Sequence, residues 1–200
     1  MTSLPPALLS ASDPALAHRV LDVIEHDVVP LTARGVARGD KVFGAALLRK
    51  DDLSLVLAET NHETANPLFH GEVHTLVRFY SLPSSDRPAT SELLFVSTHE
   101  PCSLCLSAIT WSGFDAIVYL FTHEDSRDSF AIPHDLRILQ EVFGTVDYRR
   151  DNAFFTARSV AELGVDDARV AERISGLSSR YAELSATYQT SRGGSGIPLP

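Results

Sequence analysis

Two short stretches of the chain bring together side chains that bind metals: HGEVH at residues 70–74 and PCSLC at residues 101–105. In the zincin pattern a glutamate follows the first histidine directly, so that it can act as a base beside two histidine ligands. Here Gly71 takes that position and Glu72 comes second. This spacing favours one imidazole ligand with a neighbouring proton carrier, so the remaining ligands must come from elsewhere.

The cysteines are the candidates for those ligands. The chain has 2 cysteines, Cys102 and Cys105, both within PCSLC. A pair at this spacing is either a redox dithiol or half of a metal site, and it is not a structural disulfide. A redox pair is expected near the first strand-to-helix turn, whereas these cysteines lie in the middle of the chain. Their position therefore favours zinc.

His70, Cys102 and Cys105 together would form a zinc site with one open position. One neutral imidazole and two thiolates balance the charge of Zn²⁺ and leave a fourth position for water. Glu72, close to the metal but not bound to it, would carry protons between water and substrate. A purely structural site would need a fourth protein ligand, for which His74 is the candidate. We expect His74 to be a packed or hydrogen-bonded histidine instead.

The elements that position these residues can be predicted from local patterns. Asp13 and Pro14 begin a helix of about four turns that is disturbed near Pro30. Two apolar runs separated by a polar turn predict a β-hairpin over 43–49 and 53–60. Further helices are expected from His70, over 101–114 and over 134–143, and strands over 92–100 and 115–123. Both metal-binding stretches then lie at helix N-termini, whose partial positive charge favours thiolates.

This order of elements predicts an α/β fold, a three-layer α/β/α sandwich with a central mixed sheet of about five strands and extra C-terminal helices. Residues 158–188 have a mostly helical pattern, and GGSG at 193–196 predicts a flexible tail. We therefore expect one main domain over residues 1–150, a helical extension over 151–190 that packs on it, and a tail over 191–200.

Size and charge limit the classes of function. A chain of 200 residues with 44% hydrophobic residues can bury one sizeable core. Its net charge of −9 argues against a strong nonspecific grip on nucleic acid. The N-terminus lacks the pattern of a signal peptide, and no apolar stretch reaches the roughly 18 residues that a membrane span needs. We expect a soluble, cytoplasmic protein with no membrane partner.

The combination of HGE with PCSLC about thirty positions later resembles the signature H-x-E with P-C-x-x-C of the cytidine-deaminase-like superfamily. The resemblance covers about residues 15–145 and includes FGAALL, which is similar to the first strand of that family. His-Gly-Glu is similar to fungal cytosine deaminase, while Glu100, Trp111 and the later THED resemble bacterial guanine deaminases.

The resemblance implies a zinc-dependent hydrolysis that removes an exocyclic amine from a ring amidine carbon and releases ammonia. Glu72 would be the catalytic residue. Asn61, with Asn66 as its substitute, would contact the substrate. Asp125 matches an aspartate that handles substrate protons, although it could also cap a turn.

Several residues near the signature have two interpretations. Trp111 could contact substrate, but its helical spacing from Leu104 and Ala108 favours the core. His99 could line the pocket or cap a strand, and Glu100 could stabilise the N-terminus of the metal-binding helix through its charge.

The substrate is the least defined part of the prediction. Guanine is the leading candidate among small heterocycles, and an amino-triazine or another cyclic amidine is an alternative. A tRNA adenosine-type deaminase shares the metal signature, but the basic C-terminal helix that it needs is not evident. A noncatalytic, zinc-stabilised binding domain is the other class, for which Glu72 would have no use. The resemblance also implies a homodimer.

Overall fold

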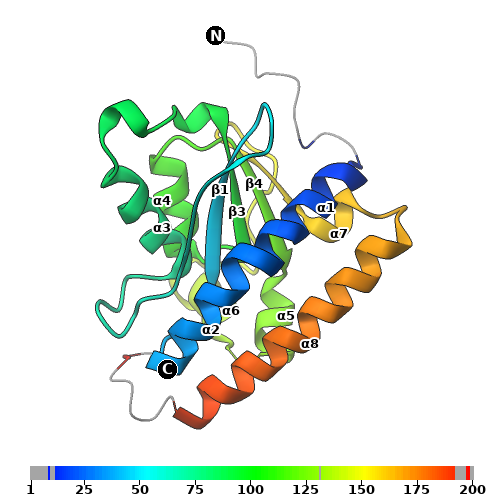
Figure 1. Cartoon of the computed structure of the whole chain (residues 1–200). Helices are drawn as coiled ribbons and strands as arrows, with labels where there is room; N and C mark the ends of the chain where they lie inside the picture. Colours follow the sequence, from blue (N-terminus) through cyan, green and yellow to red (C-terminus); the bar gives the residue numbers. More distant parts are fainter. Residues whose placement is uncertain (1–8, 10–11, 131, 192–196, 199–200) are drawn as a thin grey trace.

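The computed structural model describes residue 9 and residues 12–130, 132–191 and 197–198. These residues form one five-stranded sheet in the order β2-β1-β3-β4-β5 (Figure 1). The strands are β1 (Gly44–Arg49), β2 (Leu55–Thr60), β3 (Leu93–His99), β4 (Ala116–Phe121) and β5 (Thr156–Ser159). β1 is antiparallel to both of its neighbours, and β3, β4 and β5 are parallel. The sheet is therefore mixed, as predicted.

Helices cover both faces of this sheet, so the predicted three-layer α/β/α sandwich is confirmed (Figure 1). One face carries α1 (Pro14–Val23), η1 (Ile24–Val28), α2 (Val29–Arg38), α7 (Val160–Leu163) and α8 (Ala168–Ser191). The other carries α3 (Gly71–Tyr80) and α4 (Ser103–Trp111). Along β1 the side chains alternate between the two cores: Ala46 and Leu48 belong to the first, and Ala45 and Leu47 to the second. This alternation follows from the two-residue period of a strand.

The first helix is longer than predicted. α1, η1 and α2 run on from Pro14 to Arg38, so the chain remains helical through Pro30. The predicted disturbance is real, because residues Ile24–Val28 form a π-helical turn directly before the proline. A proline lacks the N–H of a regular helical bond and its ring crowds the preceding turn. The wider π turn accommodates this ring, so the helix continues instead of ending.

Two elements differ from the sequence analysis. β5 takes in residues 158 and 159, which we assigned to a helical segment, because four residues are too few to show a clear period. α5 (His123–Asp128) begins where we expected the end of a strand, and a capping box formed by Thr122 and Asp125 fixes its start. The remaining elements are α6 (His134–Phe143), as predicted, and two short 3₁₀ turns, η2 (Ser84–Asp86) and η3 (Thr90–Glu92).

The C-terminal helix α8 packs along the first helix. Arg173 of α8 donates hydrogen bonds to Oδ1 of Asp22 at 2.7 Å and to the carbonyl of His18 at 3.2 Å. Tyr181 and Leu177 of α8 are buried in the first core. Of the predicted flexible tail, only residues 191, 197 and 198 lie within the described part of the chain, and GGSG lies outside it. No helix among the described residues is both long and apolar enough to cross a membrane.

Candidate active site

The candidate site lies where the N-termini of α3 and α4 meet at one end of the sheet. His70 is the N-cap of α3 and Cys102 is the N-cap of α4, so both predicted helix starts are confirmed. Gly71 allows α3 to begin directly against β1. A Cβ atom at Gly71 would lie 2.8 Å from the carbonyl oxygen of Phe43, closer than side-chain carbons approach backbone.

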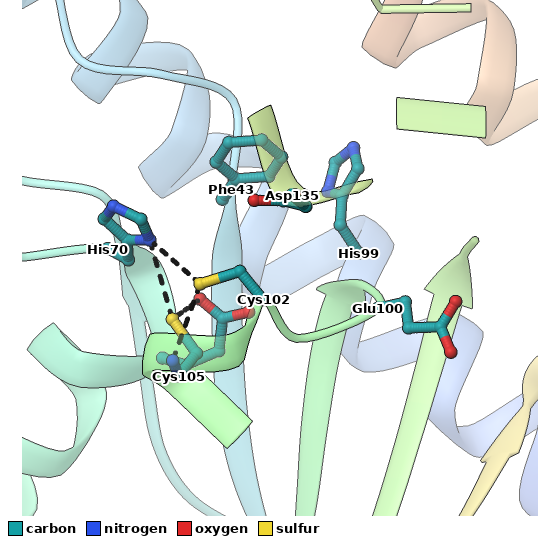
Figure 2. A pocket seen from close by; sticks show the side chains of 8 residues that line it. Phe43, His70, His99, Glu100, Cys102, Cys105 and Asp135 are labelled. Carbon is teal, nitrogen blue, oxygen red and sulfur yellow. Dashed lines mark hydrogen bonds between the residues drawn. The ribbon is translucent and has the colours of Figure 1, made fainter. Parts of the chain in front are cut away.

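Three potential metal ligands converge at this point (Figure 2). Nδ1 of His70 lies 3.6 Å from the sulfur of Cys102 and 3.6 Å from the sulfur of Cys105. The three ligand atoms all lie within 4.8 Å of one another, and no other such trio occurs among the described residues. Both thiols are free and buried. One nitrogen and two sulfur donors at this separation fit zinc and leave room for a further ligand.

The charges of the three residues also fit a cation. Without metal, burial lowers the pKa of His70, but hydrogen bonding and charge from Cys102, together with Glu63 and Glu72, raise it overall to about 9. Hydrogen bonding from Cys105 and the imidazole of His70 holds the pKa of Cys102 well below its usual value. Burial raises the pKa of Cys105. Metal binding needs a neutral imidazole and two thiolates, so the proton held by His70 and the one held by Cys105 would be released when zinc binds.

A buried polar chain orients His70 from behind. Glu63 Oε1 lies 3.6 Å from Nε2 of His70 and accepts a hydrogen bond of 3.0 Å from Nζ of Lys41. The amide of Asn61 donates to Glu63, and its oxygen accepts from the backbone N–H of Gly71. Such outer groups fix the ring orientation of a ligating histidine. Asn61 is fully buried and lines neither of the two cavities described below, so it holds the ligand loop in place.

Glu72 is positioned for proton transfer beside the trio. Its Oε1 accepts a hydrogen bond of 2.9 Å from Ser97 of β3, and its Oε2 lies 3.3 Å from the sulfur of Cys105. The side chain is buried, and burial followed by the charge of Cys102 raises its pKa. A buried carboxylate with a raised pKa, next to a metal site, is a candidate general acid and base.

Two neighbouring spaces that share lining residues adjoin the trio. The inner chamber leaves about 10 Å³, roughly the space for one water molecule. The outer cavity has a volume of about 310 Å³ and mostly apolar walls that include Leu68, Ile132 and Ile138. Phe43, His70, Cys102 and Asp135 line both spaces. A flat ring in the outer cavity would thus present one edge to the three ligand residues.

Asp135 is a site residue that the sequence analysis does not identify. It lies in the first turn of α6 and lines both spaces (Figure 2). Burial, followed by the charges of Cys102 and Glu72, raises its pKa to about 8. The only sequence signal was an acidic residue after Pro133 at the start of a predicted helix, which is also a common capping pattern.

The aspartate that we did predict, Asp125, lies elsewhere. Its Oδ2 accepts a hydrogen bond of 2.9 Å from the backbone N–H of Thr122 and caps α5, and it does not line the cavities. Asn66 is also outside them, since its Oδ1 accepts from the N–H of Leu68 at 3.0 Å in a surface turn. The alternative that Asp125 caps a turn is therefore the one that the structure favours.

Trp111 is neither a core residue nor a cavity wall. Its side chain is 90% exposed at the C-terminal end of α4, so the preference for a core position was wrong. The helical spacing from Leu104 did not indicate burial, because Leu104 is itself 40% exposed. The buried residues of α4 are Cys105 and Ile109, which face the sheet.

The other residues with two interpretations are now placed. Nδ1 of His74 lies 2.9 Å from the carbonyl of Thr60, so His74 is hydrogen-bonded and stands outside the metal trio, as expected. Glu100 is buried, pairs with Arg150 at 3.1 Å and accepts from the N–H of His123 at 3.2 Å. These contacts hold the loop that precedes Cys102, and Glu100 also lines the inner chamber. His99 lines the inner chamber.

Comparison with known proteins agrees with this geometry. Residues 26–121 match the family model of the cytidine and deoxycytidylate deaminase zinc-binding region. The matched residues include β1, all three metal ligands and Glu72. The match supports a zinc-dependent hydrolytic deaminase of the cytidine-deaminase-like superfamily. The resemblance inferred from the signature is thereby confirmed. No curated protein matches the chain in sequence.

Solved structures show the same fold at low sequence identity. The chain is similar to guanine deaminase from Nitrosomonas europaea, with 19% identity and a TM-score of 0.53 over 93% of this chain and 96% of that one. It is also similar to a structure in complex with 2,6-diaminopurine, with 20% identity and a TM-score of 0.52 over 97% and 94% of the two chains. At these identities the likeness concerns the fold.

Removal of His70 and of His74 should affect zinc binding differently. We expect His70→Ala to lose most of its bound zinc, because it removes one of three ligands, whereas His74→Ala should retain one zinc per chain. Metal analysis of the purified proteins by mass spectrometry checks this. Loss of zinc in both variants, with both still folded, would make His74 a fourth ligand and the site structural.

Proposed function

We propose that this deaminase hydrolyses the exocyclic amine of a small, flat nitrogen heterocycle, with guanine as the leading candidate. The observation that carries the proposal is the apolar cavity of about 310 Å³ that adjoins the trio. That volume lies at the lower end of the range of small-molecule sites and suits a free base better than a nucleotide. The similar structures, a guanine deaminase and a complex with 2,6-diaminopurine, support testing purines first.

The residues of the site supply the steps of such a hydrolysis. When bound, zinc lowers the pKa of a coordinated water toward about 7. Glu72 would take a proton from the attacking water and deliver it to a ring nitrogen, while a carbon–oxygen bond forms at the amine-bearing carbon. Glu72 would then take the proton of the new hydroxyl group and pass it to the amine; the carbon–nitrogen bond breaks, the carbonyl forms and ammonia leaves. Ser97, which donates to Glu72, keeps the carboxylate turned towards the trio.

We propose Asp135 as the substrate contact in place of Asp125. It lines both spaces, so it stands at the edge where a ring in the outer cavity approaches the trio. A carboxyl group there can accept a hydrogen bond from a ring N–H or an amine and, when protonated, donate one. Apolar walls around it strengthen such a bond, because a polar group in that position has little water to compete with it.

Association and location remain proposals. Large apolar side chains are exposed on α3 and α4, namely Val77, Tyr80, Leu104 and Trp111, and this surface supports a homodimer. The exposed position of Trp111, unexplained within a single chain, fits such an interface. A cytoplasmic location also stays a prediction.

An ammonia-release assay on the zinc-loaded protein tests the function. The panel contains guanine, cytosine, adenine, their nucleosides and amino-triazines. We expect a single strong responder among the free bases, and we expect Glu72→Gln to bind zinc as the wild type does while its turnover falls by at least about 10²-fold, the scale of general acid–base catalysis. Equal turnover in Glu72→Gln would defeat the role of Glu72, and silence across the panel would point to a macromolecule or an unusual amidine.

Two aspartate variants distinguish the structure from the sequence prediction. Asp135→Asn should lower kcat/KM for the responding base by about 10- to 100-fold, because a hydrogen-bonding carboxyl group in the cavity wall is altered at the substrate edge. Asp125→Asn should stay within about 2-fold of wild type, since asparagine also caps helices. Steady-state kinetics on both variants checks this, and the reverse order of effects would restore Asp125 as the substrate contact.

A further inference from the structure

His99 is a buried polar residue that the proposed mechanism leaves without a task. Its side chain is 1% exposed and lines the inner chamber together with Asp135 and Phe43. Nε2 of His99 is buried and has no hydrogen-bond partner among the described residues. In Figure 2 the ring of His99 lies on the opposite side of the two cysteines from His70, and like Asp135 it lines the chamber. A buried nitrogen without a partner is rare in a folded protein and calls for a ligand.

Packing alone does not explain a histidine at this position. Four aromatic rings surround it at centroid distances between 4.7 and 5.5 Å: Phe43, Phe121, Phe130 and Tyr181. A phenylalanine would suit such a cage equally well and would leave no polar atom unsatisfied. Burial, followed by the charge of His123, lowers the pKa of His99 to about 3. The ring is therefore neutral at physiological pH, with one N–H and one bare nitrogen.

The direction of the hydrogen bond between Thr98 and His99 decides which nitrogen of the imidazole carries the proton. The backbone N–H of Gly44 donates to Oγ1 of Thr98 at 2.9 Å. The same Oγ1 lies 2.9 Å from Nδ1 of His99. After accepting from Gly44, the hydroxyl still has one lone pair and its own hydrogen, so it can accept from an Nδ1–H or donate to a bare Nδ1. If Thr98 donates to Nδ1, the proton of the imidazole is on Nε2, the atom without a partner.

We propose that His99 is a specificity residue that donates an uncharged hydrogen bond from Nε2–H to an acceptor on the substrate heterocycle. This inference rests on the proposed function. The inner chamber has room for about one water-sized group. The acceptor is therefore a single atom, either an exocyclic oxygen or an unprotonated ring nitrogen. A heterocycle without an acceptor at that edge leaves the buried N–H unpaired and binds more weakly. A substituent larger than one atom at that edge does not fit.

The test measures binding of four purines to the zinc-loaded protein by calorimetry in a Glu72→Gln background. The probes are guanine and three analogues that each lack one acceptor. 2-Aminopurine lacks the exocyclic oxygen, and 7-deazaguanine and 3-deazaguanine each lack one ring nitrogen. We expect His99→Leu to weaken binding of guanine by about 10- to 100-fold and to have little effect on the one analogue that lacks the acceptor. His99→Gln retains an N–H donor and should restore guanine binding to within about 5-fold.

His123 is the matched control, since it is also buried but lines neither cavity. His123→Gln should leave the ratios between the four purines unchanged. A similar loss for all four purines in His99→Leu, or no loss for any of them, would overturn the inference, because a merely structural histidine does not discriminate between analogues.

Nitrogen NMR of the histidine rings tests the inference without any substrate. We expect a neutral His99 with its proton on Nε2 at pH 7, and a proton on Nδ1 would overturn the proposal because Nε2 would have no hydrogen to donate. A wild-type protein that releases ammonia from no member of the panel contradicts the proposed function instead, and the NMR result still decides the state of His99.

Discussion

The site depends on how closely α3 approaches β1. Gly71 starts the helix against the backbone of Phe43 and Gly44, where a Cβ atom would lie 2.8 Å from the Phe43 carbonyl oxygen. Only this approach brings His70, at the end of one loop, within reach of two cysteines at the start of α4. Because both helices point their N-termini at the same place, partial positive charge gathers there and stabilises the thiolates that a metal needs.

Buried charge around the trio is compensated in pairs. Lys41 pairs with Glu63 beside His70 in the wall of the outer cavity, and Arg150 pairs with Glu100, which lines the inner chamber close to Cys102. A buried carboxylate without a partner would be strongly destabilising, and removal of one partner costs more than the pair contributes. The two ion pairs therefore act as supports that fix the ligands, while Glu72 and Asp135, with raised pKa values and no cation pair of their own, face the chamber.

The metal trio and Glu72 could be predicted because their spacing is local and their chemistry is restrictive. The hairpin, the two metal-binding helices and the mixed sheet followed from periodicity for the same reason. Asp135 could not be recognised, and for His99 the sequence left a pocket role and a strand cap both open, because the cavity joins Phe43, the end of β3 and the start of α6, which are far apart in the chain. Asp125 and Trp111 show the opposite error, because each was interpreted from its local sequence context. In the structure Asp125 is part of the capping box of α5, and Trp111 is exposed.

The central claim is that His70, Cys102 and Cys105 are the complete set of protein ligands and leave one position to water. X-ray absorption at the zinc edge of the purified, zinc-loaded protein measures this directly. The account predicts two sulfur scatterers at about 2.3 Å and two lighter scatterers at about 2.0–2.1 Å, of which only one shows the outer-shell pattern of an imidazole. Two imidazole patterns, or a four-ligand protein shell without water, would contradict it.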